Sequence, residues 1–199
     1  MVVGLAVYYI ILRALGKKQT AGHIVASFVF CFYLIGILTM TGVCLKGSFS
    51  PRFVFIPFVD MLRGPVDTAL NILLFVPLGV FLPLLYEKFD TIGKIALIGF
   101  LISLSVEIAQ MFSTGATDIN DLITNTAGAC VGFGVNKLLY KAIPKSWIGQ
   151  IQVKGTQCYY ELVIFWVGSM LMMLTVQVDI FHALFPARMA DGEMQEWKS

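Results

Sequence analysis

Charged side chains are scarce in this chain. Only 13% of its 199 residues are Asp, Glu, Lys or Arg, and its mean hydropathy is +0.83. A soluble domain usually carries about 25% charged residues, so the scarcity excludes that class. The net charge of +2 is too small, and the basic residues too scattered, for a nucleic-acid partner. The composition therefore indicates an integral membrane protein.

Familiar catalytic and metal-binding motifs are also missing. The sequence has no Walker sequence, no GxSxG elbow, no HExxH motif and no paired Cys/His spacing. Its four cysteines form no CxxC pair, which argues against a structural disulfide. We expect His23 and His182, at the ends of apolar segments, to lie at the membrane interface without a catalytic role. The sequence thus predicts no cofactor and no metal site.

Long apolar runs fill most of the chain instead. A helix needs about 20 mostly apolar residues to cross a bilayer, and six segments approach or reach that length. They are 1–15, 22–45, 66–86, 92–112, 119–140 and 159–185. We expect an all-α fold, a polytopic membrane bundle of about six transmembrane helices. It forms a single membrane domain over 1–199, with a polar tail at 186–199. Whether the short segment 1–15 spans the membrane fully is left open.

The basic residues predict the orientation of this bundle. Nine of the fourteen Lys and Arg residues fall on one side of the alternating spans, and the positive-inside rule makes that side cytoplasmic. These nine are Arg13, Lys17, Lys18, Lys88, Lys94, Lys137, Lys141, Lys145 and Lys154. With six spans, both termini and the connection at 113–120 then face outward.

Polar side chains gather near the predicted outer ends of three spans. Glu107 lies roughly 9 Å below the outer boundary of its span, at about 1.5 Å of rise per residue. A carboxylate at the bilayer centre costs about 2.5 to 3.5 kcal/mol, so we expect Glu107 to face the bundle or a wet cavity and to contact a ligand. Gln110 shares its helix face. Asp67 and Asn71 lie at the same depth in the span at 66–86.

The span at 119–140 adds a stripe of polar and then small residues. Asp118, Asp121 and Asn125 follow i, i+3, i+7 spacing, and the stripe continues as Gly128 and Gly132. Glycines four apart let membrane helices approach closely, so we expect this stripe to pack on the span at 66–86. Capping of the helix start explains the aspartates equally well, and interhelical hydrogen bonding explains the amides.

The candidate site residues follow from these patterns. The ligand-binding candidates are Asn71, Glu107, Gln110, Asp118, Asp121 and Asn125. Glu107 and Asp121 are the candidates for catalysis. Gly128 and Gly132 are the helix-packing candidates.

Three sequence blocks resemble the VanZ-like family of bacterial integral membrane proteins, named for a teicoplanin-resistance protein. They are NILLFVPLG at 71–79, SLSVEIAQMF at 103–112 and TDINDLITNTAGACVG at 117–132, in a core at about 50–135. The resemblance implies a multi-pass protein of the bacterial cell membrane. Its characteristic positions would be Asn71, Glu107, Gln110, Asp118, Asp121, Asn125 and Gly128. Many members have an arginine just ahead of the acidic loop, where this chain reads GAT from Gly115, so Arg52 or Arg63 would have to replace it.

Three functions remain open from the sequence. In the leading one, an outward-facing polar cavity binds or modifies a cell-envelope component, such as a glycopeptide, a lipid or a cell-wall precursor. Lowered susceptibility to teicoplanin-type lipoglycopeptides would follow. In the alternative, Glu107, Asp118 and Asp121 hold a divalent metal in a membrane enzyme that acts on a lipid-linked phosphate. A small lipid or solute transporter is third, disfavoured because no inverted repeats are visible. Apart from the lipid bilayer, the partners stay unknown.

Overall fold

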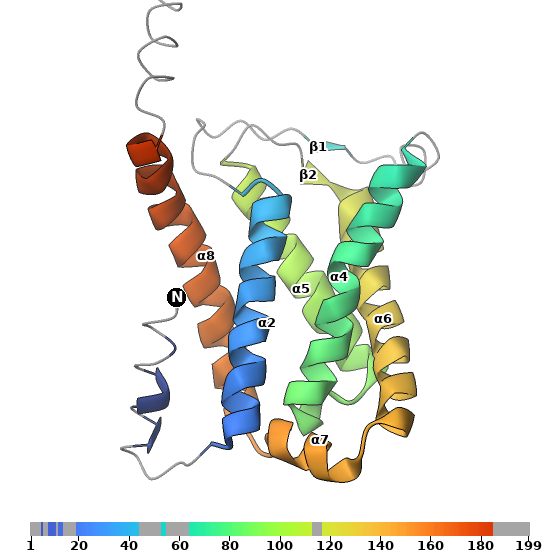
Figure 1. Ribbon diagram of the computed structural model, residues 1–199. Coiled ribbons are helices and arrows are strands. Elements are labelled where there is room, and N and C mark those ends of the chain that lie inside the picture. The colour runs from blue at the N-terminus through green and yellow to red at the C-terminus, as the bar shows by residue number, and fades with distance from the viewer. Residues whose placement is uncertain are drawn as a thin grey trace, which may run out of the picture.

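The computed structural model describes residues 5, 8–10, 12–13, 19–43, 53–54, 64–112 and 117–184. Most of the expected first span, the arginines at 52 and 63, the 113–116 connection and the tail at 186–199 lie outside these residues. Five long helices make up the described part (Figure 1). They are α2 (Ala21–Met40), α4 (Pro65–Leu85), α5 (Ile92–Gln110), α6 (Ile119–Ala142) and α8 (Gln157–Leu184).

Short elements connect these helices at the two ends of the bundle. The 3-10 helix η1 (Glu87–Phe89) precedes α5, and α7 (Lys145–Ile151) lies between α6 and α8 at the lower end in Figure 1. At the upper end, β1 (Phe53–Val54) pairs in parallel with β2 (Thr117–Asp118). Successive long helices run in opposite directions, so the starts of α4 and α6 meet the end of α5 at the upper end.

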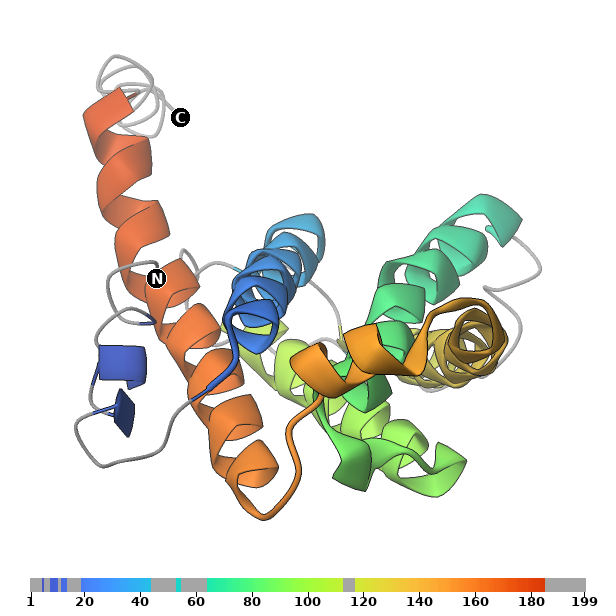
Figure 2. The same ribbon diagram turned by 60° about the horizontal axis from the view of Figure 1, so that its bottom comes forward.

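The helices confirm the expected all-α membrane bundle. Four of them are long and apolar enough to cross a bilayer, namely α2, α4, α5 and the Gln157–Leu174 part of α8. Helix α6, with 24 residues, is long enough but more polar, and it lies beside α4 and α5 in both ribbon views (Figures 1 and 2). Of the six expected spans, four are therefore present as apolar helices and a fifth as the more polar α6.

Three glycines allow α4 and α6 to approach closely, and we call their contact the glycine seam. A Cβ atom on Gly128 would overlap the carbonyl oxygen of Ile72, and one on Gly132 would overlap that of Val76. From the opposite side, a Cβ on Gly79 would overlap the carbonyl oxygen of Ala129. Because the overlapping atoms are backbone, no side-chain rotation could relieve the clash. Backbone thus packs directly on backbone along this seam.

Side chains from neighbouring helices satisfy the backbone of α4 around its two internal prolines, Pro77 and Pro83. The Tyr33 hydroxyl donates to the Leu74 carbonyl at 2.7 Å and accepts from the Leu78 N–H at 3.1 Å, so it stands between two groups that usually bond each other. Lower down, the Pro83 carbonyl accepts from the Tyr140 hydroxyl at 2.7 Å. Such bonds matter inside a membrane, where no water is available to replace them.

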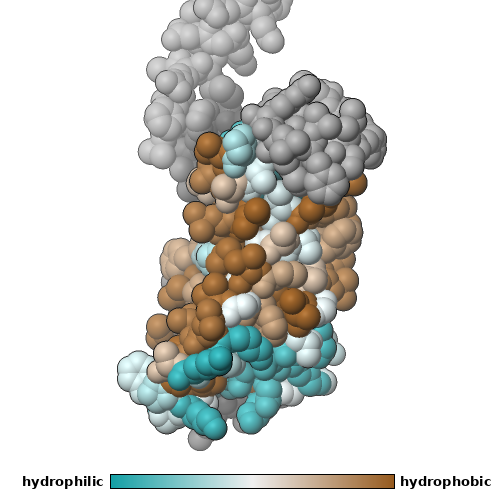
Figure 3. Space-filling view, turned by 90° about the vertical axis from the view of Figure 1, so that its right-hand side faces the viewer, coloured by the Kyte–Doolittle hydropathy of each residue, from teal (hydrophilic) through white to brown (hydrophobic). Residues whose placement is uncertain are grey.

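A broad apolar band covers the face of the molecule seen in Figure 3, and hydrophilic residues gather below it. The lower end contains η1, the start of α5, the end of α6 and α7. These segments, with the link into α8, carry six of the nine basic residues that predict the cytoplasmic side. They are Lys88, Lys94, Lys137, Lys141, Lys145 and Lys154. The lysines thus collect at one end of the bundle, opposite the starts of α4 and α6.

Candidate functional site

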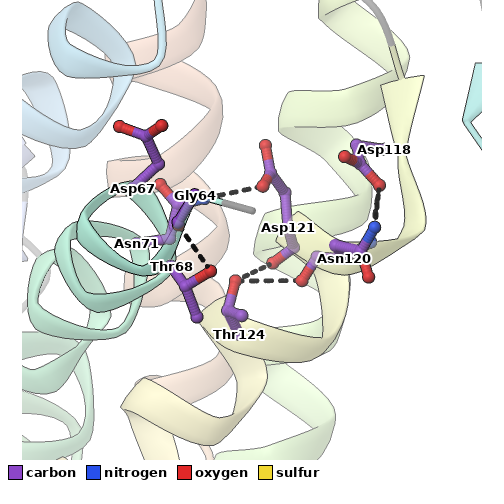
Figure 4. A pocket seen from close by; sticks show the side chains of 8 residues that line it. All are labelled: Gly64, Asp67, Thr68, Asn71, Asp118, Asn120, Asp121 and Thr124. Atoms are coloured by element: carbon purple, nitrogen blue, oxygen red, sulfur yellow. Dashed lines mark hydrogen bonds between the residues drawn. The ribbon is translucent and has the colours of Figure 1, made fainter. Parts of the chain in front are cut away.

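A side-chain hydrogen bond joins α4 and α6 at the upper end of the bundle. Asn71 lies in the second turn of α4, and its Nδ2 donates to Oδ1 of Asp121, in the first turn of α6, at 2.6 Å (Figure 4). The glycine seam directly below holds the two helices close enough for this bond. Two residues that are 50 positions apart in the sequence therefore share one site.

Asp118 caps α6, the ordinary role that its position in the sequence also allowed. Its Oδ1 accepts from the backbone N–H of Asn120 at 2.8 Å and from Nδ2 of the same residue at 2.9 Å. A carboxylate at this position satisfies free backbone donors and complements the helix dipole. The second carboxylate, Asp121, faces Asn71 instead.

Glu107 is buried, with 3% of its surface exposed, and ties the end of α5 to the start of α6. Its Oε2 accepts from the backbone N–H of Asp118 at 2.9 Å. Asp118 is also the last residue of β2, which pairs with β1. The deep carboxylate that the sequence singled out therefore orients the segment from which Asp118 and Asp121 project.

The two remaining candidates bond to neighbouring helices. Gln110 donates from Nε2 to the carbonyl of Thr41, just beyond α2, at 2.7 Å. Asn125 donates from Nδ2 to Oγ of Ser103 on α5 at 3.0 Å, and both residues are buried. The Oδ1 of Asn125 and the Oε1 of Gln110 are buried and have no hydrogen-bond partner among the described residues. Asn125 thus lies in the α5–α6 contact, and Gln110 links α5 to the end of α2.

Two pockets that share three lining residues open beside the Asn71–Asp121 bond. We call the first the polar pocket; it has a volume of about 160 Å³ (Figure 4). It is lined by Gly64, Asp67, Thr68, Asn71, Asp118, Asn120, Asp121 and Thr124. The second, the mixed pocket, has a volume of about 460 Å³ and is lined by Met40, Thr41, Asp67, Leu70, Asn71, Leu73, Leu74, Gln110 and Asp121. Asp67, Asn71 and Asp121 line both.

These linings divide the candidate residues into two groups. Asn71, Asp118, Asp121 and Gln110 line one or both pockets, whereas Glu107 and Asn125 line neither of the two. The polar lining residues absent from the candidate set are Asp67, Asn120 and the threonines at 41, 68 and 124, and the remaining ones are Gly64, Met40, Leu70, Leu73 and Leu74. Asp67 had a signal in the sequence, because it lies four residues before Asn71 on the same helix face.

The carboxylates do not gather as metal ligands. Glu107 accepts from the Asp118 N–H, Asp118 from the Asn120 N–H and Asp121 from Asn71. Within the part of the chain that the structure describes, no three His, Cys, Asp or Glu residues are grouped so that they could hold a metal ion. The arrangement therefore gives the metal-dependent enzyme alternative no support.

Comparison with known proteins identifies the family of this chain. A family model described as VanZ/LLP1 matches residues 5–140. The chain belongs to the VanZ/LLP1 family. A curated relative, Protein VanZ from Enterococcus faecium, is 40% identical over 63 residues, which are 31% of this chain. Those residues span only 38% of that relative's length. No solved structure matches the chain.

A second polar cluster lies at the lysine-rich end, where the sequence predicted none. His23 on α2 and Glu161 on α8 are fully buried, with Nε2 and Oε2 3.0 Å apart. The other ring nitrogen of His23, Nδ1, is 2.7 Å from the carbonyl oxygen of Ile151, and the Tyr8 hydroxyl donates to Oε1 of Glu161 at 3.2 Å. His23 lies in the first turn of α2 and is buried, and its depth at the membrane interface stays a prediction. Its ring joins α2, α7 and α8 inside the bundle.

Proposed function

We propose that this VanZ/LLP1-family protein binds an amphiphilic component of the cell envelope where α4 and α6 begin. The proposal rests on two pockets of different polarity that share Asp67, Asn71 and Asp121 as lining residues. A headgroup in the polar pocket would meet carboxylates, amides and hydroxyls. Its apolar chain would follow Leu70 and Leu73, which line the mixed pocket and are more than half exposed on α4.

The charge of the polar pocket favours a particular class of headgroup. Asp67, Asp118 and Asp121 line it, and its described lining contains no Lys or Arg. Carboxylates attract ammonium groups and accept hydrogen bonds, and they repel phosphates that no cation neutralises. We therefore propose a ligand with an amine or several hydrogen-bond donors in its headgroup, joined to an apolar chain.

Orientation links this pocket to the envelope. On the positive-inside rule the lysine-rich end faces the cytoplasm, which puts both pockets at the outer face of the bilayer. Lipids, lipid-linked wall precursors and lipoglycopeptides meet the membrane at that face. Lowered susceptibility to teicoplanin-type compounds, which the family resemblance implies, would then follow from binding or modifying such a ligand.

Asp121 and Glu107 take different parts in this proposal. Asp121 lines both pockets and contacts the ligand. The ligand either replaces the hydrogen bond from Asn71 or adds to it. Glu107 lines neither of them and acts as a positioning residue, because its carboxylate holds the Asp118 N–H at the start of α6. No bond-breaking step is assigned to either residue.

The proposal is tested by the lipids that the protein retains. Wild type, Asp121→Asn and Leu73→Trp would be extracted from a Gram-positive host in styrene–maleic acid particles, and the bound molecules identified by mass spectrometry. Asp121→Asn removes one of the two carboxylates that line both pockets, and Leu73→Trp fills the mixed pocket. We expect both to lose an amine-bearing amphiphile that wild type retains.

Asp90→Asn is the matched control, because Asp90 pairs with Lys137 at the opposite end and lines neither pocket. This variant should retain the ligand as wild type does. Identical retention by wild type, Asp121→Asn and Leu73→Trp would show that the pockets are not the binding site.

A further inference from the structure

An apolar groove lies between α5 and α8 at the lysine-rich end, far from the two pockets described above. Its volume is about 380 Å³. Both helices begin at this end of the bundle (Figure 2). The rings of Phe89, just before α5, and Tyr159, at the start of α8, meet edge to face with centroids 5.3 Å apart. The groove opens beside this contact.

The walls of the groove are hydrocarbon and face outward. Leu97 and Leu101 from α5 are 57% and 51% exposed, and Val163 from α8 is 59% exposed. Ile98 and Leu162 form its floor and are more buried. From Lys94 to Leu101 the groove follows α5 for about 10 Å, at 1.5 Å per residue, which is about two thirds of the hydrocarbon thickness of one leaflet.

Two lysines lie where this groove reaches the polar end of the bundle. Lys94 lines it, and its Nζ donates to the backbone carbonyl of Lys88 at 2.6 Å. The Nζ of Lys88 lies 5.7 Å from the ring centroid of Tyr159, another lining residue. Both ammonium groups are therefore held at the same mouth of the groove.

Neighbouring carboxylates are engaged by other lysines. Oε1 of Glu87 lies 3.6 Å from Nζ of Lys154, and Oδ1 of Asp90 lies 2.5 Å from Nζ of Lys137. Among the described residues, no carboxylate comes within salt-bridge distance of Lys88 or Lys94. Lys94 also lies in the first turn of α5, where the helix dipole is already positive. The mouth of the groove therefore has positive charge that these carboxylates leave unbalanced.

We infer that this groove binds one anionic phospholipid, with an acyl chain between α5 and α8 and its phosphate at Lys88 and Lys94. An apolar channel that ends in two such ammonium groups complements a molecule with a hydrocarbon tail and a negative headgroup. The leaflet also agrees, because this is the end that the charge distribution predicts to be cytoplasmic, where anionic lipids attract basic residues beside the membrane. The site is separate from the pockets of the proposed function and does not depend on them.

Native mass spectrometry of the full chain can test this site. The protein would be titrated in detergent with dioleoylphosphatidylglycerol or, as a neutral probe, dioleoylphosphatidylcholine. We expect one phosphatidylglycerol to bind wild type at least about 30-fold more tightly than phosphatidylcholine. In Lys88→Gln/Lys94→Gln that preference should weaken about 30-fold, which corresponds to about 1 kcal/mol for each lysine.

Lys141→Gln/Lys145→Gln is the matched control, since it removes two charges from the same end but from α6 and α7. It should bind phosphatidylglycerol as wild type does. Leu97→Trp, which fills the groove and keeps the lysines, should also lose the tight lipid. Equal affinity of wild type for the two lipids, or equal loss in both lysine pairs, would overturn the inference. Unchanged binding by Leu97→Trp would show that the lysines act without the groove.

Discussion

At the scale of single residues, Glu107 and Asp121 differ in their hydrogen-bond partners. Both are carboxylates near the same end of the bundle. Glu107 accepts from a backbone N–H, whereas Asp121 accepts from a side chain on another helix and lines both pockets. The first arrangement is suited to holding the chain in place, and the second to exchanging a protein partner for a ligand.

Glu107→Gln and Glu107→Ala should therefore differ in stability. Glutamine keeps an oxygen that can accept from the Asp118 N–H, so its melting temperature in detergent should stay close to that of wild type. Alanine leaves that N–H without this acceptor and should lower the free energy of unfolding by about 1 to 3 kcal/mol. Lipid retention should survive in Glu107→Gln and fall in Asp121→Asn. Equal melting of the Gln and Ala variants would mean that the bond to Asp118 does not fix the start of α6.

At the scale of elements, the sequence could predict that α4 packs against α6, but it could not predict the His23–Glu161 contact between α2 and α8. The small residues Gly128 and Gly132 share a helix face with Asp121, and that face meets α4. Asn125, at the edge of the same face, bonds to Ser103 of α5 instead. Glu161 is only the third residue of the expected span at 159–185, so it lacked the depth within a span that singled out Glu107. Its partner His23 lies 138 positions away, and no spacing rule joins residues so distant.

The glycine seam makes a prediction with a control on the same helix. Gly132→Ala should destabilise the protein by about 1 to 3 kcal/mol, because its Cβ would press on the backbone of Val76. Around Gly134 a Cβ would meet nothing within 4 Å, so Gly134→Ala should melt at the wild-type temperature or slightly above it. Detergent melts of the two variants measure the difference. Identical melting temperatures would show that the backbone of α4 can shift at Val76 without loss of stability.

At the scale of the whole molecule, the sequence was enough to predict a helical membrane bundle, because apolar runs of about 20 residues have few other folds open to them. It was not enough to predict which polar residues line the pockets. Spacing places Asn71, Glu107 and Asn125 on helix faces, but the rotation of each helix is decided by packing. Asn125 turns to Ser103, and Asn71 turns to Asp121.

Orientation in the membrane is the prediction that belongs to this scale. On a background without the four native cysteines, Ser146→Cys and Thr114→Cys would each be treated with an impermeant thiol reagent in intact cells. Ser146 is exposed at the start of α7, on the lysine-rich end, and should react only after the cells are opened. Thr114 lies in the connection predicted to face outward and should react at once. The reverse pattern would invert the bundle and put the pockets at the cytoplasmic face.

The polarity of α6 has a consequence for how the chain enters the membrane. Its amides depend on helices made earlier in synthesis, since Asn125 bonds to Ser103 of α5 and Asn136 donates to the Val80 carbonyl of α4 at 3.0 Å. A segment with these groups unbonded is costly in hydrocarbon. When α6 leaves the ribosome, α4 and α5 have already been translated and can offer hydrogen-bond partners to its amides as it inserts. Stable insertion of α6 therefore depends on α4 and α5, and it depends on their being synthesised first.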